Sequence, residues 1–508
     1  MRTILVICLV VSSIQMVLSQ SMFLYDNSYY SSQQSYSARL EGMGNLSIAV
    51  PEPESEAYIN PANAALTSGI LLRFHPNYLH FNNASEYSYS SSSSPSSSTS
   101  QKDEYRTTSA SFPLDALISF DILHIGASYS REAFSSRDYS ENGSTPSNPS
   151  KYETQITNYG STAKLLADYD LGILSIGAMG TFIGTNLENK YNSKNNYSYD
   201  TNSSSITRTI ENKTPDDFSS KEIRLGALLN LGDVTQISTL FGLSSAKDEQ
   251  KASETRYDGI LQPNNNHSIY SAEIPSNLIG AELRQRLSKT FLLGIRVQRT
   301  GLTEEDFGKN NYLDYGILSP IYEKRKNAET DATEFGGGVG ISFQPTEGTL
   351  ASIEFELTTF THNDKSIEAV ENGPSYSLHR GAISGETKYS GVREALRAGG
   401  EVAISSFLTL RAGIEAVWQS YDYEYNYISD YSTPPATTTA SKSLGNTSAF
   451  CTGRLGATFT LSFLRIDYAL ALQTSPWYSS HSIYSNISYS SSQDDMHFRH
   501  SLTATIQL

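Results

Sequence analysis

The chain has 508 residues and carries 53 acidic against 37 basic side chains, a formal net charge of −16. This acidic balance argues against a nucleic acid as partner. Only 38% of the residues are hydrophobic, and beyond residue 19 no stretch is apolar enough to cross a bilayer as a helix, which excludes a helical membrane protein. A β-barrel is not excluded, because its strands are apolar only at alternate positions.

The first 19 residues are typical of a secretory signal peptide. Arg2 precedes the apolar run 4–11, and a cleavage site after Ser19 would leave 20 as the first mature residue. Cys8 is lost with the signal, so Cys451 remains as the only cysteine of the mature chain. We therefore expect neither a disulfide framework nor a cysteine metal site.

The stretch from Ala38 to Leu66 is too broken by glycine and proline to form a strand or a full helix. It contains Gly42-Met43-Gly44 and Asn60-Pro61-Ala62. With these two motifs the sequence resembles the FadL-type hydrophobic-compound transporters of the outer membrane, whose N-terminal hatch carries a G-M-G-like turn and an N-P-A motif. PorV-type proteins of a bacterial secretion system share this opening. The resemblance implies that residues 20–69 form a plug in a barrel mouth, with Gly42, Gly44, Asn60, Pro61 and Ala62 as its motif residues.

From residue 70 to the C-terminus, apolar and polar side chains alternate. In 408–418 the even positions are all apolar, whereas Arg411 and Glu415 stand at odd positions. Successive side chains of a strand point to opposite faces, so this segment predicts a strand with one apolar and one charged face. The segments 464–472 and 222–231 repeat the pattern.

Short turns and long polar segments alternate along the same region. Predicted short turns lie near 113–115, 170–172, 232–233, 288–289, 345–348, 405–406 and 462, and predicted long loops at 82–105, 130–155, 184–218, 244–268, 301–331, 361–392, 421–446 and 474–494. Such sorting is typical of a transmembrane barrel, with short periplasmic turns and long extracellular loops. We predict an all-β fold: a transmembrane antiparallel β-barrel of about 14–16 strands over residues 70–508, with both termini periplasmic. The number of strand-like segments favours about 16 strands, whereas the resemblance to the FadL-type family favours about 14.

Charges of both signs are predicted on the inward faces. They include Arg284, Arg397, Glu401, Arg411, Glu415, Arg454, Arg465 and Asp467. Charges in a narrow lumen must pair or stay hydrated, so they form either a ladder that rigidifies the wall or contacts with the plug or a substrate. The glycine-rich run 336–340 either admits the plug backbone or is ordinary wall glycine. A lateral opening is predicted at Pro76, which cannot donate to the ladder, or at Gly126 in the third strand, where the resemblance places such an opening.

The sequence carries no motif of a hydrolase, a metal site or a phosphate-binding loop, so neither an enzyme nor a cofactor is expected. By resemblance, the function is passive uptake of a hydrophobic or amphipathic small molecule, fatty-acid-like or aromatic. Expected partners are outer-membrane lipids and the barrel-insertion machinery. The last strand resembles the signal that this machinery recognises, but it ends on Leu508 instead of an aromatic residue. The alternatives are a PorV-type scaffold in secretion or surface-protein assembly and a general porin. The sequence leaves the oligomeric state and the ligand open.

Overall fold

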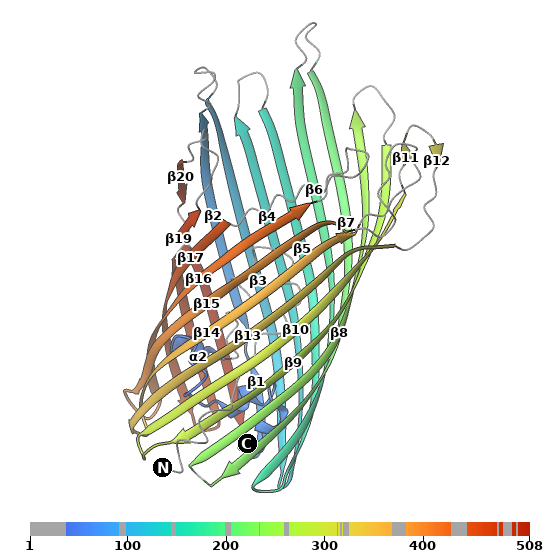
Figure 1. The fold of residues 1–508 in the computed structure, drawn as a ribbon. Coiled ribbons are helices and arrows are strands. Elements are labelled where there is room, and N and C mark those ends of the chain that lie inside the picture. The colour runs from blue at the N-terminus through green and yellow to red at the C-terminus, as the bar shows by residue number, and fades with distance from the viewer. Residues whose placement is uncertain are drawn as a thin grey trace.

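A computed structural model describes residues 37–508, except 91–97, 144–148, 199–204, 233, 259–263, 312, 315–316, 319–324, 368–382, 428–443, 475–476, 481–489 and 494–495. The predicted signal peptide, residues 1–19, lies outside the described residues, as do residues 20–36 of the predicted plug. The described chain forms a closed antiparallel barrel of sixteen strands (Figure 1). This agrees with the strand count from the sequence and exceeds the fourteen usual for the family that it resembles.

The barrel wall is built in chain order, and each strand pairs with the one before it. Its strands are β1 (Ile70–Phe74), β2 (Asn77–Ser90), β3 (Ser98–Phe120), β4 (Leu123–Gly143), β5 (Pro149–Asp170), β6 (Leu174–Ser198), β7 (Ser205–Leu231), β8 (Thr235–Asp258), β9 (Asn264–Arg286), β10 (Phe291–Asn311), β13 (Arg325–Thr346), β14 (Thr349–Ile367), β15 (Ile383–Ala403), β16 (Leu408–Tyr427), β17 (Leu444–Leu461), β18 (Leu464–Thr474) and β21 (Met496–Gln507). β1 and β2 share the first position, because both pair with β3 on one side and β21 on the other. Four short strands lie outside this series: β11 (Leu313–Asp314), β12 (Ile317–Leu318), β19 (Trp477–Ser480) and β20 (Ser490–Gln493).

The alternation predicted from the sequence sorts side chains between the outside and the lumen. On β16, Leu410, Ile414 and Trp418 are exposed on the outer surface, whereas Arg411 and Glu415 are buried inside. The wall is therefore apolar outside and charged inside, the reverse of a soluble barrel and the arrangement that a bilayer requires. Among the described helices, none has both the length and the apolar character needed to cross a membrane.

One predicted turn is wrong. Residues 113–115 lie inside β3, and the first short turn is at Asp121–Ile122, where Asp121 adopts a φ of 48°. Pro113 resembles a turn residue, but the outward side chains of Phe112 and Leu114 continue the strand through it. The other predicted short turns lie between the ends of consecutive strands, as expected.

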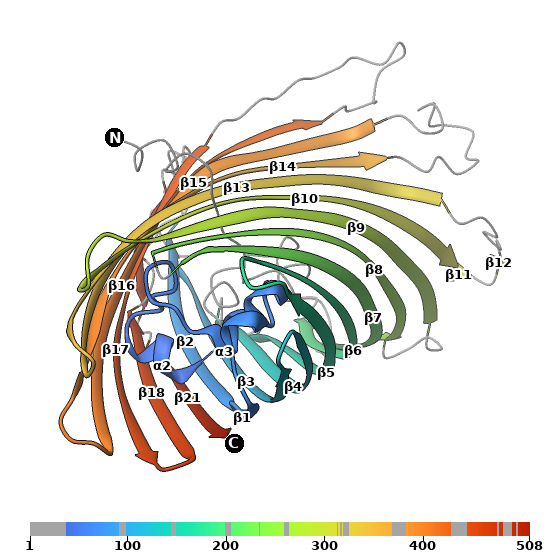
Figure 2. The same cartoon turned by 90° about the horizontal axis from the view of Figure 1, so that it is seen from below.

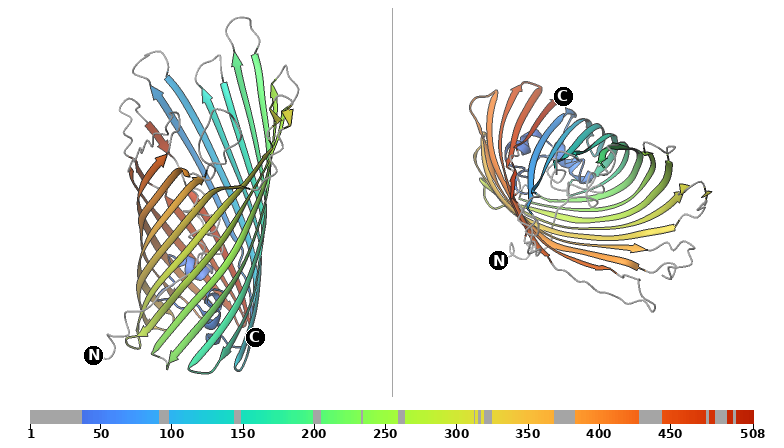
Figure 3. Two further views of the ribbon diagram at one scale, coloured as in Figure 1. Left: turned by 45° about the vertical axis from the view of Figure 1, so that its right-hand side comes forward. Right: turned by 90° about the horizontal axis from the view of Figure 1, so that it is seen from above.

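The long polar segments are mostly strand in the described residues, not loop. β6 and β7 remain paired from the barrel floor up to Ser198 opposite Ser205, well inside the predicted loop 184–218. Backbone pairing needs no apolar side chain, so a polar hairpin continues its ladder beyond the apolar band. Figures 1 and 3 show β2 to β8 rising far above the rim formed by β14 to β18.

Residues 37–69 lie inside the lower part of the barrel (Figures 1 and 2). We call residues 37–69 the inner segment; it contains α2 (Ala38–Gly42), α3 (Pro53–Glu56) and the 3-10 helix η1 (Pro61–Leu66). Ser37 caps α2 by accepting from the Leu40 N–H, and Asn60 caps η1 by accepting from the Ala62 N–H. Helices this short are not stable alone, so the surrounding wall must hold them.

Candidate functional site: the inner segment and the lumen wall

Wall glycines receive the backbone of the first half of the inner segment. A methyl group on Gly413 would lie 2.6 Å from the carbonyl oxygen of Met43, and one on Gly399 would lie 2.8 Å from the Met43 carbonyl carbon. Gly44, next in the chain, has a φ of +88°, which a side chain would strain. This contact therefore requires glycine on both the wall and the inner segment.

The second half rests on a similar pair of glycines. A methyl group on Gly177 of β6 would lie 2.5 Å from the Ala62 nitrogen. Gly226 is directly opposite Gly177 on β7, and a methyl group there would lie 3.2 Å from the same nitrogen and overlap the Asn60 side chain. The predicted motif Asn60-Pro61-Ala62 is thus seated on a two-glycine cradle.

The glycine-rich run 336–340 meets the inner segment at alternate positions. A methyl group on Gly338 would lie 2.6 Å from Cδ1 of Ile48, and one on Gly340 would lie 3.1 Å from Cβ of Ala49, so the run admits the inner segment at these two positions. The Tyr58 side chain of the inner segment contacts a different part of the wall. Its hydroxyl is 2.6 Å from the carbonyl oxygen of Ala116 on β3 and 3.0 Å from that of Ala127 on β4.

Charged wall residues satisfy the backbone of the part of the inner segment that has no regular structure. The Glu354 carboxylate accepts from the N–H groups of Ser47, Ile48 and Ala49 at 2.7 to 3.1 Å. Arg284 donates to the carbonyl oxygens of Ser47 and Ile48 at 3.1 and 3.2 Å. These bonds replace those that a helix or sheet would provide, since buried backbone groups need partners.

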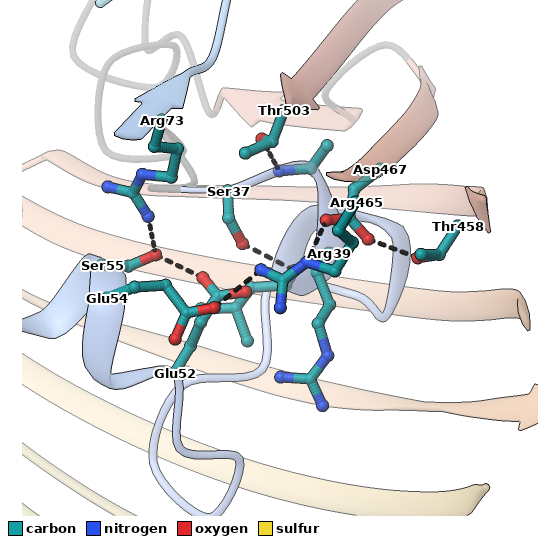
Figure 4. Close-up of polar contacts among 12 residues, drawn as sticks. Ser37, Arg39, Glu52, Glu54, Ser55, Arg73, Thr458, Arg465, Asp467 and Thr503 are labelled. Atoms are coloured by element: carbon teal, nitrogen blue, oxygen red, sulfur yellow. Dashed lines mark hydrogen bonds and ion pairs between the residues drawn. The ribbon is translucent and has the colours of Figure 1, made fainter. Parts of the chain in front are cut away.

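A series of ion pairs starts on the inner segment, continues over the lumen face of the wall and ends on the inner segment. Arg39 pairs with Glu401 at 2.6 Å, and Glu401 with Arg411 at 2.8 Å. Arg411 pairs with Asp467 at 3.1 Å, Asp467 with Arg465 at 2.9 Å, and Arg465 with Glu54 at 2.6 Å. Figure 4 shows Arg465 between Asp467 and Glu54. The series links both halves of the inner segment to β15, β16 and β18.

The remaining predicted lumen charges also face inward. Arg284 binds Glu56 of the inner segment through both terminal nitrogens at 2.7 Å. Arg397 bridges Glu415 and Glu356 at 2.7 and 2.8 Å, and Arg454 also pairs with Glu415. Both roles considered for these charges are therefore present: some pairs stay within the wall, and others hold the inner segment.

The first strand is weakened at His75-Pro76. The register places His75 opposite Pro113 of β3 and Pro76 opposite Leu502 of β21. The His75 N–H donates to Pro113, and the Leu502 N–H donates to Pro76, each at 3.0 Å. Residues of such an antiparallel pair normally exchange two bonds, but neither proline can donate in return. One ladder bond is thus missing on each side of the strand.

Polar side chains line the lumen beside this break. Asp115 accepts from Arg73 at 2.6 Å and lies 3.0 Å from His75 Nε2. Arg73 also donates to Ser55 of the inner segment (Figure 4). In contrast, Gly126 lies within an uninterrupted strand that pairs on both sides, and Leu117 and Leu166 occupy the space at that glycine. Of the two predicted openings, only Pro76 coincides with a break in this structure.

Sequence reasoning missed the backbone clamp at Glu354 and the glycines at 177, 226, 399 and 413. A signal existed for two of these glycines, since Gly399 stands between the inward residues Arg397 and Glu401, and Gly413 between Arg411 and Glu415. Among the described residues, no group of three or more His, Cys, Asp or Glu could hold a metal ion.

No protein-family model matches the chain, and no curated protein matches it in sequence. Among solved structures, the Pseudomonas putida toluene transporter TodX is similar at 12% identity over 93% of this chain and 99% of its own, with a TM-score of 0.45. A Pseudomonas aeruginosa FadL homologue matches at 12% identity over 93% and 98%, with a TM-score of 0.39. The Ralstonia pickettii toluene transporter TbuX matches at 11% identity over 93% and 98%, with a TM-score of 0.36. These likenesses concern overall form only, and the barrel described above rests on its strand pairing.

Proposed function

We propose that the protein is an outer-membrane channel for passive uptake of hydrophobic or amphipathic small molecules, closed by its inner segment. The observation that carries this proposal is the fit of the inner segment to the lumen. It contributes no strand to the wall, yet inward glycines and inward charges are placed to receive its backbone. A gated channel requires a segment that fills the lumen and is held against the wall by non-covalent contacts.

The proposed route enters at the end where β2 to β8 project, which we take as extracellular, and reaches the inner segment. Movement of that segment would free the lumen face of the first strand at His75-Pro76. Because two ladder bonds are already missing there, opening the wall sideways at this place breaks fewer bonds than opening an intact ladder. An apolar solute could then leave toward the membrane without crossing an aqueous periplasmic mouth. Outer-membrane lipids and the barrel-insertion machinery are the partners that this placement implies.

Neither rival has an observation of its own in its favour. A general porin needs an open polar lumen, whereas residues 37–69 occupy the lower lumen here. A PorV-type scaffold would share the N-terminal motifs, but no feature of the described residues favours a docking role. No catalytic role is proposed.

A reversible lock tests the channel directly. A β-carbon on Gly42 would lie 3.7 Å from Cβ of Ala469 on β18, within the range for a disulfide. Gly42→Cys with Ala469→Cys, in a Cys451→Ser background, would tie α2 to the wall. We expect oxidised protein in liposomes to exclude a fluorescent fatty acid and reduced protein to admit it. Each single-cysteine variant is the control for folding and for the oxidant. Equal uptake by the oxidised and reduced double variant would contradict a moving closure.

A further inference from the structure

Three aromatic rings meet on the outer surface of the barrel, where its first and last strands join. They are Tyr78 of β2, Tyr468 of β18 and His500 of β21. The Tyr468 hydroxyl lies 2.8 Å from His500 Nδ1, and the ring centroids of both tyrosines lie within 6.4 Å of the imidazole. All three side chains are exposed on the outward face. We call these three residues the seam cluster.

The seam cluster lies within the apolar band of the last two strands. Beyond it along the strands, Phe498 is paired with Leu472, and both are outward and exposed. Before it, Leu502 is outward and exposed on β21. An aromatic girdle would mark the edge of the band, whereas here apolar residues continue on both sides. An ionisable side chain in such a place is costly and usually serves a function.

The seam cluster adjoins the break in the first strand. Tyr78 is directly opposite His500, and Pro76 is two residues earlier on the same outward face, opposite Leu502. His80 follows on that face, with Nδ1 3.5 Å from the Thr108 hydroxyl. The polar groups on the outer wall are therefore gathered beside the place where the wall lacks ladder bonds.

The chemistry of the seam cluster favours a ligand that accepts hydrogen bonds. When the Tyr468 hydroxyl donates to Nδ1, the imidazole proton is on Nε2, which becomes a donor. The Tyr78 hydroxyl is a second donor on the same face. A carboxylate, with two acceptor oxygens, is the head group that such a pair would bind most strongly.

We propose that the seam cluster is an exit subsite that binds the carboxylate of a fatty-acid-like molecule as it leaves the wall at Pro76. This inference rests on the proposed channel function and narrows its cargo to amphipathic acids. The head group is held at the seam cluster while the tail passes along the neighbouring outward residues into the lipid. A pure hydrocarbon would gain nothing from the subsite.

The test compares two probes and two variants. His500→Leu combined with Tyr78→Phe removes the two proposed donors, the imidazole Nε2–H and the Tyr78 hydroxyl, and leaves the Tyr468 hydroxyl on a more apolar outward face, which a membrane barrel tolerates. Phe498→Leu, an apolar exchange on the same face, is the control. In liposomes we expect oleate uptake through the double variant to fall about tenfold, the loss expected for a hydrogen bond to a charged group. Uptake of toluene should stay unchanged, and the control should transport both probes normally.

Unchanged oleate uptake would overturn the subsite, and so would an equal loss of oleate and toluene uptake in a folded double variant. Oleate binding in nanodiscs is measured alongside transport. If the wild type transported neither probe but bound oleate through the seam cluster, the channel would be contradicted and the subsite upheld. If native mass spectrometry showed that the double variant loses bound phospholipid and not oleate, the site would hold a lipid head group, and the proposal would be wrong.

Discussion

A methyl group at Gly177 should loosen the inner segment without disturbing the barrel. In Gly177→Ala the new carbon would lie 2.5 Å from the Ala62 nitrogen, against backbone that cannot rotate away. Overpacking of this kind costs about 1–3 kcal/mol, which lowers the docking equilibrium constant about 5- to 140-fold. Gly184 on the same strand provides the matched control, because a methyl group there meets nothing within 4 Å.

Two readouts follow the loosened state. Ala64 is fully buried in η1, so a cysteine placed there in a Cys451→Ser background reports undocking by its rate of maleimide labelling. We expect faster labelling and more frequent channel opening in planar bilayers for Gly177→Ala, with Gly184→Ala behaving like the parent. Equal labelling and opening in the two variants, with normal heat-modifiability of both, would show that Gly177 and Gly226 do not hold η1 in place.

Further predictions concern the series of ion pairs, pH and topology. Arg411→Glu replaces the cation between Glu401 and Asp467 with a third acid, leaving only Arg39 beside Glu401 and Arg465 beside Asp467. It should lower the free energy of unfolding by about 3–5 kcal/mol; an unchanged urea midpoint would contradict the pairing. Burial raises the pKa of Glu52, and Glu54 raises it further against the opposing charges of Arg39, Arg465 and Arg73. The docked state then binds this proton more tightly than the unfolded chain, so the contribution of Glu52 to docking is fully present below pH 4.5 and is lost as the pH rises through the raised pKa. Glu52→Gln should flatten this dependence of the maleimide labelling rate, and docking that strengthens with rising pH would show the sign to be wrong. Protease added to intact cells should cut within 184–218 or 301–331 and spare the turns at 231–234 and 345–348; cuts confined to those turns would reverse the orientation.

The barrel could be predicted from the sequence because a bilayer imposes one strict rule. Each wall strand must show apolar side chains at alternate positions, and 408–418 or 464–472 shows this without any tertiary information. The turn near 113–115 was wrong because proline signals a turn locally, whereas here Pro113 lies within a continuous strand and omits only the bond that its N–H would have donated to His75. The pairing that keeps Pro113 in the strand lies between strands and has no local signature.

The seating of the inner segment was harder to predict. The lumen charges were found from strand parity, but their partners Arg39, Glu54 and Glu56 lie hundreds of residues away, and the register that brings them together depends on the whole barrel. The bonds from Glu354 to three successive N–H groups use backbone donors, which every residue carries, so the sequence has no distinctive signal for them.

The inner segment as closure of the barrel is the central claim, and deletion of residues 38–66 tests it most directly. Heat-modifiability first establishes that the deletion variant forms a barrel. We predict a larger, steadier conductance in planar bilayers than that of the full chain, together with loss of selective uptake of hydrophobic cargo. A deletion variant that folds and remains closed would show that another part of the chain seals the barrel, and would contradict the claim.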